Sequence, residues 1–326
     1  MRIEGAAPPT DADPAPPCPI AELPEELLVE ILVCVAVSDI GDFVRLAQVC
    51  KRLAYLVAAE DRVWRRVVEG TEFGLAAMHY RYALTVEGRP LSQPLGTIPD
   101  LSESITLQSI PLTPTYPSYQ QTFRSRPRIR FNGAYISTVN YTRPGASATN
   151  SLTWGSPILI VTYYRYLRFF RDGSCISLLT TTEPADVVPY LLKEHLPISG
   201  RKERGESALP SAVMKDALRG RWRLSGCPFP DQQPYVPEQL EEEELEDEVE
   251  GDIHIETEGV IPKYLYKMQL AITSPSRGAK NNKLAWKGYW SYNKLTDDWG
   301  EFRLKNDRGF WFSRVKSYGH GLSAGI

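Results

Sequence analysis

Histidine and cysteine, the residue types that most often carry catalysis or bind metals, are few and scattered in this chain. None of the four histidines stands at a metal-ligand spacing or beside a cysteine. The five cysteines include no C-x-x-C pair, and no nucleophile elbow, phosphate-binding loop or zinc-protease motif is present. We therefore expect no catalytic residue, no metal and no cofactor.

Arginine and aromatic residues are the best candidates for binding chemistry. Residues 124–171 hold eight arginines and no acid, interleaved with tyrosine and phenylalanine. Guanidinium groups beside aromatic rings suit a carboxylate or phosphate on a peptide. The alternative is a solvated strand face whose aromatic rings lie over the barrel. RNA binding would use the same residues, but the second half of the chain has no further basic region to support it. The candidate substrate-binding residues are Arg130, Tyr163, Arg165, Arg168 and Arg171.

Composition limits the class of protein. The 326 residues carry 37 Lys+Arg and 40 Asp+Glu, a net charge of −3, which argues against a generic nucleic-acid binder. The longest apolar runs are too short to span a membrane, and the start of the chain does not resemble a secretory signal. Scattered cysteines suit a reducing compartment. We expect a soluble protein of the cytoplasm or the nucleus.

Four segments follow one another along the chain. Residues 1–19 form a Pro/Ala-rich tail that we expect to be disordered. Residues 20–87 have helical periodicity, residues 88–127 form a Pro/Ser-rich linker, and residues 128–320 alternate as strands do. We expect an α+β protein with a helical domain before a β domain.

The helical domain contains recognisable start signals. Apolar residues recur at spacings of three and four from Leu23 to Val35. Asp39 is a suitable N-cap for a second helical region. A further helix is expected through Trp64 to about Leu84.

The β domain has strand candidates over residues 128–141, 157–170, 175–181, 220–225, 264–273, 283–293, 299–304 and 309–318. Asp172-Gly173 suits a tight hairpin turn. About eight mainly antiparallel strands favour a closed barrel, for which lipocalin-like closure is one form, with a sandwich as the alternative. Tryptophans in the last strands are large enough to fill a small barrel. They are Trp286, Trp290, Trp299 and Trp311.

An acidic segment interrupts the β domain. Residues 238–252 contain ten acids and no base, and four prolines precede them. We predict a disordered loop inserted over residues 226–261. Without these acids the net charge would be −3 + 10 = +7, so the near-neutral balance comes from this loop.

Residues 23–64 resemble an F-box. The resemblance is carried by Leu23-Pro24-Glu25, Ile31-Leu32, Val49-Cys50-Lys51-Arg52-Leu53 and Trp64. It implies docking of the Skp adaptor of a cullin-RING ubiquitin ligase. It also implies that ten apolar residues divide between helix packing and the adaptor interface: Leu23, Pro24, Leu27, Ile31, Leu32, Val35, Phe43, Leu46, Val49 and Leu53. An amphipathic hairpin packed on its own barrel is the alternative.

Most of residues 128–319 resemble the C-terminal domain of the F-box-only protein nine family and its fungal relatives. The segments PILIVTYYRYLRFFRDGSCISLLTTTEPADVVPYL and KLAWKGYWSYNKLTDDWGEFRLKNDRGFWFSRVKSYG carry much of this resemblance.

Together the two resemblances imply a non-catalytic substrate-recognition subunit of an SCF-type ubiquitin ligase. The F-box would dock the Skp adaptor and, through it, the cullin-RING core. The barrel would hold a protein substrate for ubiquitination and proteasomal degradation. Two alternatives remain: a barrel that binds a small hydrophobic ligand, and an F-box scaffold that acts outside a ligase.

Overall fold

Two compact units make up the chain, one ending at Val63 and the other beginning at Trp64. The computed structural model describes residues 19–91, 112–144, 158–197, 210–226, 249–276, 278, 280–304 and 307–318. Apart from residue 19, the predicted tail lies outside the described residues. Across the described ranges, no helix has the length and apolar character needed to cross a membrane.

The first unit is helical, as predicted. Its elements are η1 (Pro19–Glu22), α1 (Glu25–Ser38), α2 (Ile40–Arg45), η2 (Leu46–Gln48) and α3 (Lys51–Ala59). Asp39 caps α2 by accepting a hydrogen bond of 2.7 Å from the backbone N–H of Gly41. Leu28, Leu32 and Phe43 are buried, so these helices share a small core.

Helix α4 (Asp61–Glu69) spans the boundary between the two units. The predicted continuation to about Leu84 is wrong, because the helix ends where Gly70 follows, and glycine is unfavourable in a helix interior. Residues 70–91, called the strap below, continue through the short turn η3 (Leu75–Ala77).

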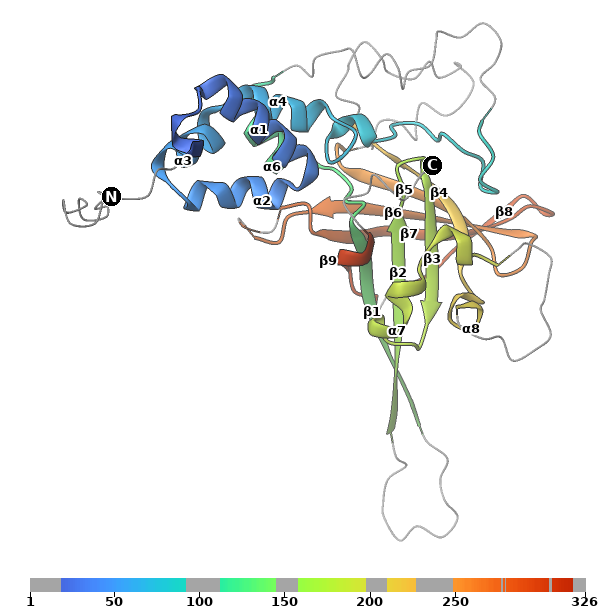
Figure 1. Cartoon of the computed structure of the whole chain (residues 1–326). Helices are drawn as coiled ribbons and strands as arrows, with labels where there is room; N and C mark the ends of the chain where they lie inside the picture. Colours follow the sequence, from blue (N-terminus) through green and yellow to red (C-terminus); the bar gives the residue numbers. More distant parts are fainter. Residues whose placement is uncertain are drawn as a thin grey trace, which may run out of the picture. The chain divides into compact units, whose positions relative to one another are not determined.

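The second unit is built around a closed antiparallel β-barrel (Figure 1). Its described strands are β1 (Gly133–Pro144), β2 (Ile158–Phe169), β3 (Ser174–Thr180), β4 (Leu218–Leu224), β5 (Asp252–Glu258), β6 (Tyr264–Thr273), β7 (Lys283–Asn293), β8 (Asp298–Glu301) and β9 (Phe310–Arg314). Eight of them close a ring in the order β6-β5-β4-β3-β2-β1-β9-β7, and β7 pairs back to β6. Strand β8 adds to one end of β7. The predicted barrel is confirmed, and the sandwich alternative is wrong.

The ring closes unevenly. Strands β6 and β7 pair along their whole length, whereas β9 pairs with β1 over Gly133–Ile136. The contact of β9 with β7 consists of two residue pairs, Lys283 with Trp311 and Leu284 with Phe310. The β7–β9 contact is therefore the shortest ladder in the ring.

Strand β5 lies inside the insertion predicted over residues 226–261 and is absent from the predicted strands. Ile253 and Ile255 are fully buried, while acids such as Glu256 alternate with them. These acids make the strand resemble the end of the acidic run. The insertion therefore ends before β5, and residues 227–248, which hold most of the acids, lie outside the described residues.

The predicted linker also contains ordered structure. Helix α6 (Tyr119–Ser125) begins at Ser118, whose hydroxyl accepts a hydrogen bond of 3.2 Å from the backbone N–H of Gln121. Phe123 is buried, and its ring centroid lies 5.9 Å from that of Trp64. Residues 112–127 thus belong to the packed second unit, and residues 92–111 lie outside the described residues.

Aromatic rings fill the barrel, and most of them lie outside the predicted set, although Trp286 of that set packs against the buried Phe310 with ring centroids 5.2 Å apart. The ring centroid of Phe169 lies 5.5 Å from that of Tyr135 and 5.9 Å from that of Trp222, and all three side chains are buried. Of the four predicted tryptophans, Trp299 and Trp311 are about half exposed. Trp222, which is fully buried and packs against Phe169 and Phe131, is therefore the tryptophan at the centre of this aromatic core.

Helices cover the outer face of β2 and β3. These are α7 (Pro184–Val187), η4 (Val188–Tyr190), η5 (Lys193–His195) and α8 (Ser211–Met214). Their buried residues include Val187 and Met214, which join Tyr166, Ile176 and Leu178 in one apolar cluster. Around Tyr166, Ile176 and Leu178, the outer faces of these two strands are therefore covered.

The predicted Asp172-Gly173 turn joins β2 to β3. Gly173 has a φ of 87°, a conformation that glycine adopts without strain, and its backbone N–H donates to Phe170 O at 3.2 Å. The ideal Cβ position of Gly173 lies 3.2 Å from Ala83 Cβ in the strap. The turn therefore needs glycine for conformation and for close approach.

Arginines on β4 bind the strap by its backbone carbonyls. Arg221 Nη1 donates to Leu84 O and Arg219 Nη1 donates to Glu87 O, each at 3.0 Å. The Arg221 guanidinium also lies 4.1 Å from the ring centroid of Tyr82. The strap is therefore attached to the barrel by charge-assisted hydrogen bonds.

Candidate functional site

Helix α1 presents apolar side chains to solvent on one face. Leu27 is 52% exposed and Ile31 is 42% exposed, and Cys34 continues the row one turn later. Leu28 and Leu32, one position further along, point into the helical core. A helix buries one stripe of its surface, so this second apolar stripe is available to a partner.

The beginning of α3 lies next to the beginning of α1. Arg52 Nη2 donates to Leu23 O at 3.0 Å, which joins the two segments. Val49, just before α3, is 68% exposed. The segments that begin α1 and α3, which carry exposed apolar residues, are therefore neighbours in the helical unit.

The ten predicted adaptor residues fall into three groups by exposure. Leu32 and Phe43 are buried and pack the helices. The exposed ones are Pro24, Leu27, Ile31 and Val49, and the partly buried ones are Leu23, Val35, Leu46 and Leu53. Val44 and Tyr55 are exposed apolar residues outside the predicted set, since helical spacing alone does not show which side chains remain uncovered.

Arg168, a predicted substrate contact, is buried. It is 2% exposed, and its Nη1 donates to Leu191 O at 2.6 Å. Its guanidinium carbon lies 3.4 Å from the ring centroid of Tyr318 and 4.8 Å from that of Phe170. Burial lowers the pKa of Arg168, and the nearby Tyr318 opposes that shift. This arginine packs the outer face of β2, where a substrate does not reach it.

Arg171 and Arg130 also bind backbone carbonyls. Arg171 Nε donates to Thr71 O of the strap at 2.9 Å, and Arg130 Nη2 donates to Lys280 O at 2.6 Å. Burial lowers the pKa of both guanidinium groups. Their described contacts therefore hold the fold together.

Arg165 and Tyr163 lie on a different face from Arg168, because side chains alternate along β2. The Arg165 guanidinium carbon lies 5.4 Å from the Trp286 ring centroid and 5.3 Å from that of Tyr289. Burial raises the pKa of the Tyr289 phenol to about 12, so this phenol is neutral at ordinary pH. Tyr163 is partly exposed. Of the five predicted residues, these two are the ones placed where a ligand has access.

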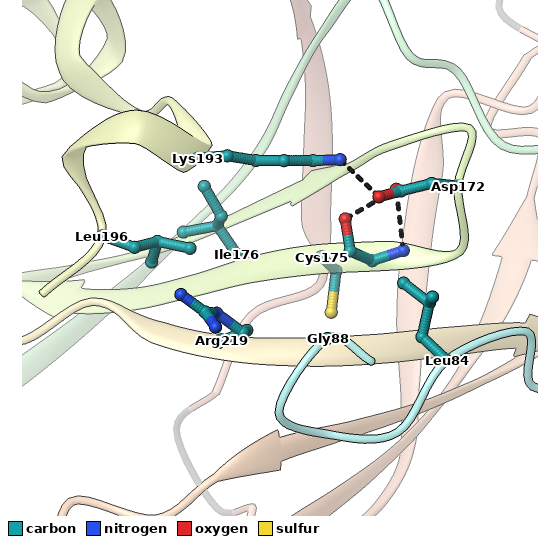
Figure 2. A pocket seen from close by; sticks show the side chains of 9 residues that line it. Leu84, Gly88, Asp172, Cys175, Ile176, Lys193, Leu196 and Arg219 are labelled. Carbon is teal, nitrogen blue, oxygen red and sulfur yellow. Dashed lines mark hydrogen bonds and ion pairs between the residues drawn. The ribbon is translucent and has the colours of Figure 1, made fainter. Parts of the chain in front are cut away.

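A small pocket lies between the strap and the paired strands β3 and β4, and Figure 2 shows its lining. Its volume is about 150 Å³, below the roughly 300 Å³ at which ligand sites usually begin. Lys193 Nζ lies 2.5 Å from Asp172 Oδ2, and burial raises the pKa of the Cys175 thiol. Arg219 of β4 donates to Glu87 O of the strap. The charged groups that line the pocket therefore already have partners within the protein.

Histidines and cysteines assemble no metal site in the part of the chain that the structure describes. His79 Nε2 lies 2.5 Å from Arg171 O, and His195 Nδ1 lies 2.9 Å from Tyr190 O. Both imidazoles therefore hydrogen-bond with backbone carbonyl oxygens. His320 lies outside the described residues.

Comparison with known families matches both parts of the chain. Residues 20–69 match the F-box-like family, and residues 113–216 match the family described as F-box only protein C-terminal region. The resemblance to F-box proteins is confirmed.

Two fungal proteins are similar in sequence. Over 74 residues the chain is 50% identical to F-box protein HRT3 of Saccharomyces cerevisiae, covering 23% of this chain and 22% of that protein. Over 206 residues it is 29% identical to F-box protein pof7 of Schizosaccharomyces pombe, covering 62% and 45%. The matches therefore span less than half the length of these relatives. No solved structure matches the chain.

Proposed function

We propose that this chain, whose two regions match F-box proteins, is the substrate-recognition subunit of an SCF-type ubiquitin ligase. Its helical unit docks the Skp adaptor and thereby the cullin-RING core. Its barrel holds a protein substrate, which is ubiquitinated and then degraded by the proteasome. The observation that carries the proposal is the exposed apolar stripe of α1, Leu27 and Ile31, inside the region that matches an F-box.

The helical unit supports this proposal through its size. A bundle of a few short helices buries too small a fraction of its surface to be very stable alone. Leaving Leu27, Ile31 and Val49 in water adds to that cost. A partner that covers these side chains stabilises the unit, as mass action requires.

The proposed role needs no catalytic group in this chain. Holding a substrate lysine beside the charged conjugating enzyme makes transfer effectively intramolecular, which is a large rate effect by itself. A subunit of this kind acts in the cytoplasm or the nucleus, where the ligase core operates.

The alternatives are weaker or separable by experiment. A carrier of small hydrophobic ligands needs a hollow barrel, whereas Tyr135, Phe169 and Trp222 fill this one with rings in contact. A scaffold that acts outside a ligase would bind the adaptor without recruiting a cullin. Capture of the cullin with the chain separates these two roles.

The test is copurification of the full chain with the Skp adaptor. Changing Leu27→Glu together with Ile31→Glu removes the apolar contact and is expected to cost about 3–6 kcal/mol of binding, since burying each such side chain contributes about 1.5–3 kcal/mol. The matched control is Val260→Glu with Leu295→Glu, two exposed aliphatic residues in barrel turns. Adaptor binding that survives in the first variant, with the fold intact by circular dichroism, contradicts the proposal.

A further inference from the structure

Strands β1 and β2 continue together beyond the point where the barrel closes. Strand β9 pairs with β1 over Gly133–Ile136, and β4 pairs with β3 over residues 174–177. The β1–β2 ladder runs on to Pro144 and Ile158, and Figure 1 shows the two strands extending past α7. Residues 137–144 and 158–165, with the end of β3, are called the arm. Among the described residues, no strand pairs with the outer edge of β1 along the arm.

One face of the arm is apolar and exposed. By register, Tyr141 lies opposite Val161, Tyr163 opposite Val139, and Leu179 opposite Arg165. Tyr141 is 56% exposed and Leu179 is 48% exposed. These side chains share the parity of the buried Leu167 and Phe169, so the arm face continues the inner wall of the barrel.

Arg165 lies at the base of the arm face. Its Nη2 lies 3.1 Å from Asp307 Oδ1, while its buried Nε has no hydrogen-bond partner among the described residues. A carboxylate binds guanidinium most strongly through two parallel bonds, to Nε and one Nη. Asp307 contacts one nitrogen, so a second carboxylate in bidentate geometry would bind Arg165 better.

The position of Asp307 indicates the direction from which a ligand would bring that second carboxylate. Its neighbour Arg308 accepts a hydrogen bond from the Ser137 hydroxyl at the first residue of the free β1 edge. A strand added along that edge would therefore begin beside Asp307 and have Arg165 within reach. Its alternate side chains would lie on the same face as Tyr141 and Tyr163.

We propose that the arm binds an acidic, extended peptide segment by β-strand addition to the free edge of β1. Apolar side chains of the peptide pack against Tyr141, Tyr163 and Leu179, and one Asp or Glu carboxylate replaces Asp307 on Arg165. Charge favours such a ligand, since residues 137–144 and 158–165 of the arm contain Arg143 and Arg165 and no acid. The inference rests on the proposed function in that this peptide is the recognition segment of the substrate.

The experiment selects peptides from a random twelve-residue phage library on the complex of the full chain with the Skp adaptor. Affinities of a selected, fluorescein-labelled peptide are then measured by anisotropy. We expect peptides with alternating apolar residues and an Asp or Glu near one end. Arg165→Gln and Tyr163→Ser are expected to weaken binding at least tenfold, and Asp307→Asn to tighten it about threefold or more. The matched control Arg219→Gln, on an arginine bound to the strap, is expected to leave affinity within twofold.

Further peptide variants identify the charged group. Replacing the peptide's acid by Gln should weaken binding at least tenfold, and a phosphoserine at that position should bind no better than the acid. Equal binding of the Gln peptide, binding that requires phosphate, unchanged affinity in Arg165→Gln and Tyr163→Ser, or a selection that yields no binder overturns the inference.

The outcome is separable from that of the proposed function. The chain carrying Leu27→Glu with Ile31→Glu should lose the adaptor yet still bind the peptide. Adaptor binding that survives those changes contradicts the ligase role alone. Loss of peptide binding in Arg165→Gln, with adaptor binding retained, supports the inference about the arm and does not test the ligase role.

Discussion

Arg168 offers a direct test of which arginines of the β domain are structural. Its guanidinium is buried under the helices that cover β2 and β3, between the rings of Tyr318 and Phe170. The change Arg168→Met keeps much of the side-chain volume and removes the charge. It leaves Leu191 O without its 2.6 Å hydrogen bond.

The magnitude follows from the interactions that the change removes and from the burial cost that it relieves. A hydrogen bond from a charged group contributes about 1.5–3 kcal/mol, and a desolvated cation–π contact contributes about 2 kcal/mol. Methionine avoids the cost of burying a charge, which offsets part of this loss. We expect a net loss of about 2–3 kcal/mol in the free energy of unfolding. For a unit of this size that corresponds to a fall in Tm of about 4–12 °C.

The assay is guanidinium chloride unfolding followed by tryptophan fluorescence, with thermal unfolding alongside. The control is Arg219→Met, which removes a partly exposed arginine bound to the strap and should cost less than about 1 kcal/mol. If Arg168→Met unfolds within about 0.5 kcal/mol of the wild-type chain, the burial cost cancels the favourable interactions of the guanidinium and the reasoning is refuted.

Two further predictions concern the strap and the turn beside it. Gly173→Ala should destabilise the second unit by about 1–2 kcal/mol in chemical denaturation because of its positive φ, whereas Gly278→Ala, whose Cβ would have no neighbour within 4 Å, should be nearly neutral. Equal effects of the two changes would contradict the strain argument. Burial raises the pKa of the Glu72 carboxyl, but the hydrogen bond and charge of Arg66 outweigh this, so the pKa lies below its ordinary value. The stability from this pair is therefore present above about pH 4.3, the ordinary pKa of glutamate, and lost as pH falls through the lowered pKa. Glu72→Gln should flatten the fall in stability between about pH 5 and pH 3, and an unchanged slope would show that the pair contributes nothing.

The sequence predicts strands well where alternation and turns are both clear. The predicted ranges 264–273 and 283–293 match Tyr264–Thr273 and Lys283–Asn293, because turn residues bound each run. Strand β5 escapes prediction because Asp252, Glu256 and Glu258 alternate with its isoleucines and continue an acidic run. Composition shows what a segment contains, but not which of its positions face inward.

The candidate site shows the same limit. Arg165 and Arg168 are three residues apart, so on a strand they must point to opposite faces. The acid-free run groups them as one patch, whereas one reaches the arm face and the other is buried under helices. In the F-box region, periodicity locates the apolar residues of α1, but Leu27 and Leu28 differ in exposure because of how the neighbouring helices pack.

The pairing of β1 with β9, the last strand of the chain to be made among the described strands, has a consequence for the order of folding. Gly133 of β1 pairs with Arg314 of β9, about 180 residues further along the chain. At about 5–20 residues per second of synthesis, β1 waits roughly 10–35 s for that neighbour to emerge. The helical unit depends on local contacts and forms without such a delay. During this interval β1 pairs with β2 while its edge toward β9 has no partner, so barrel closure is the step at which a newly made chain is most open to misassembly.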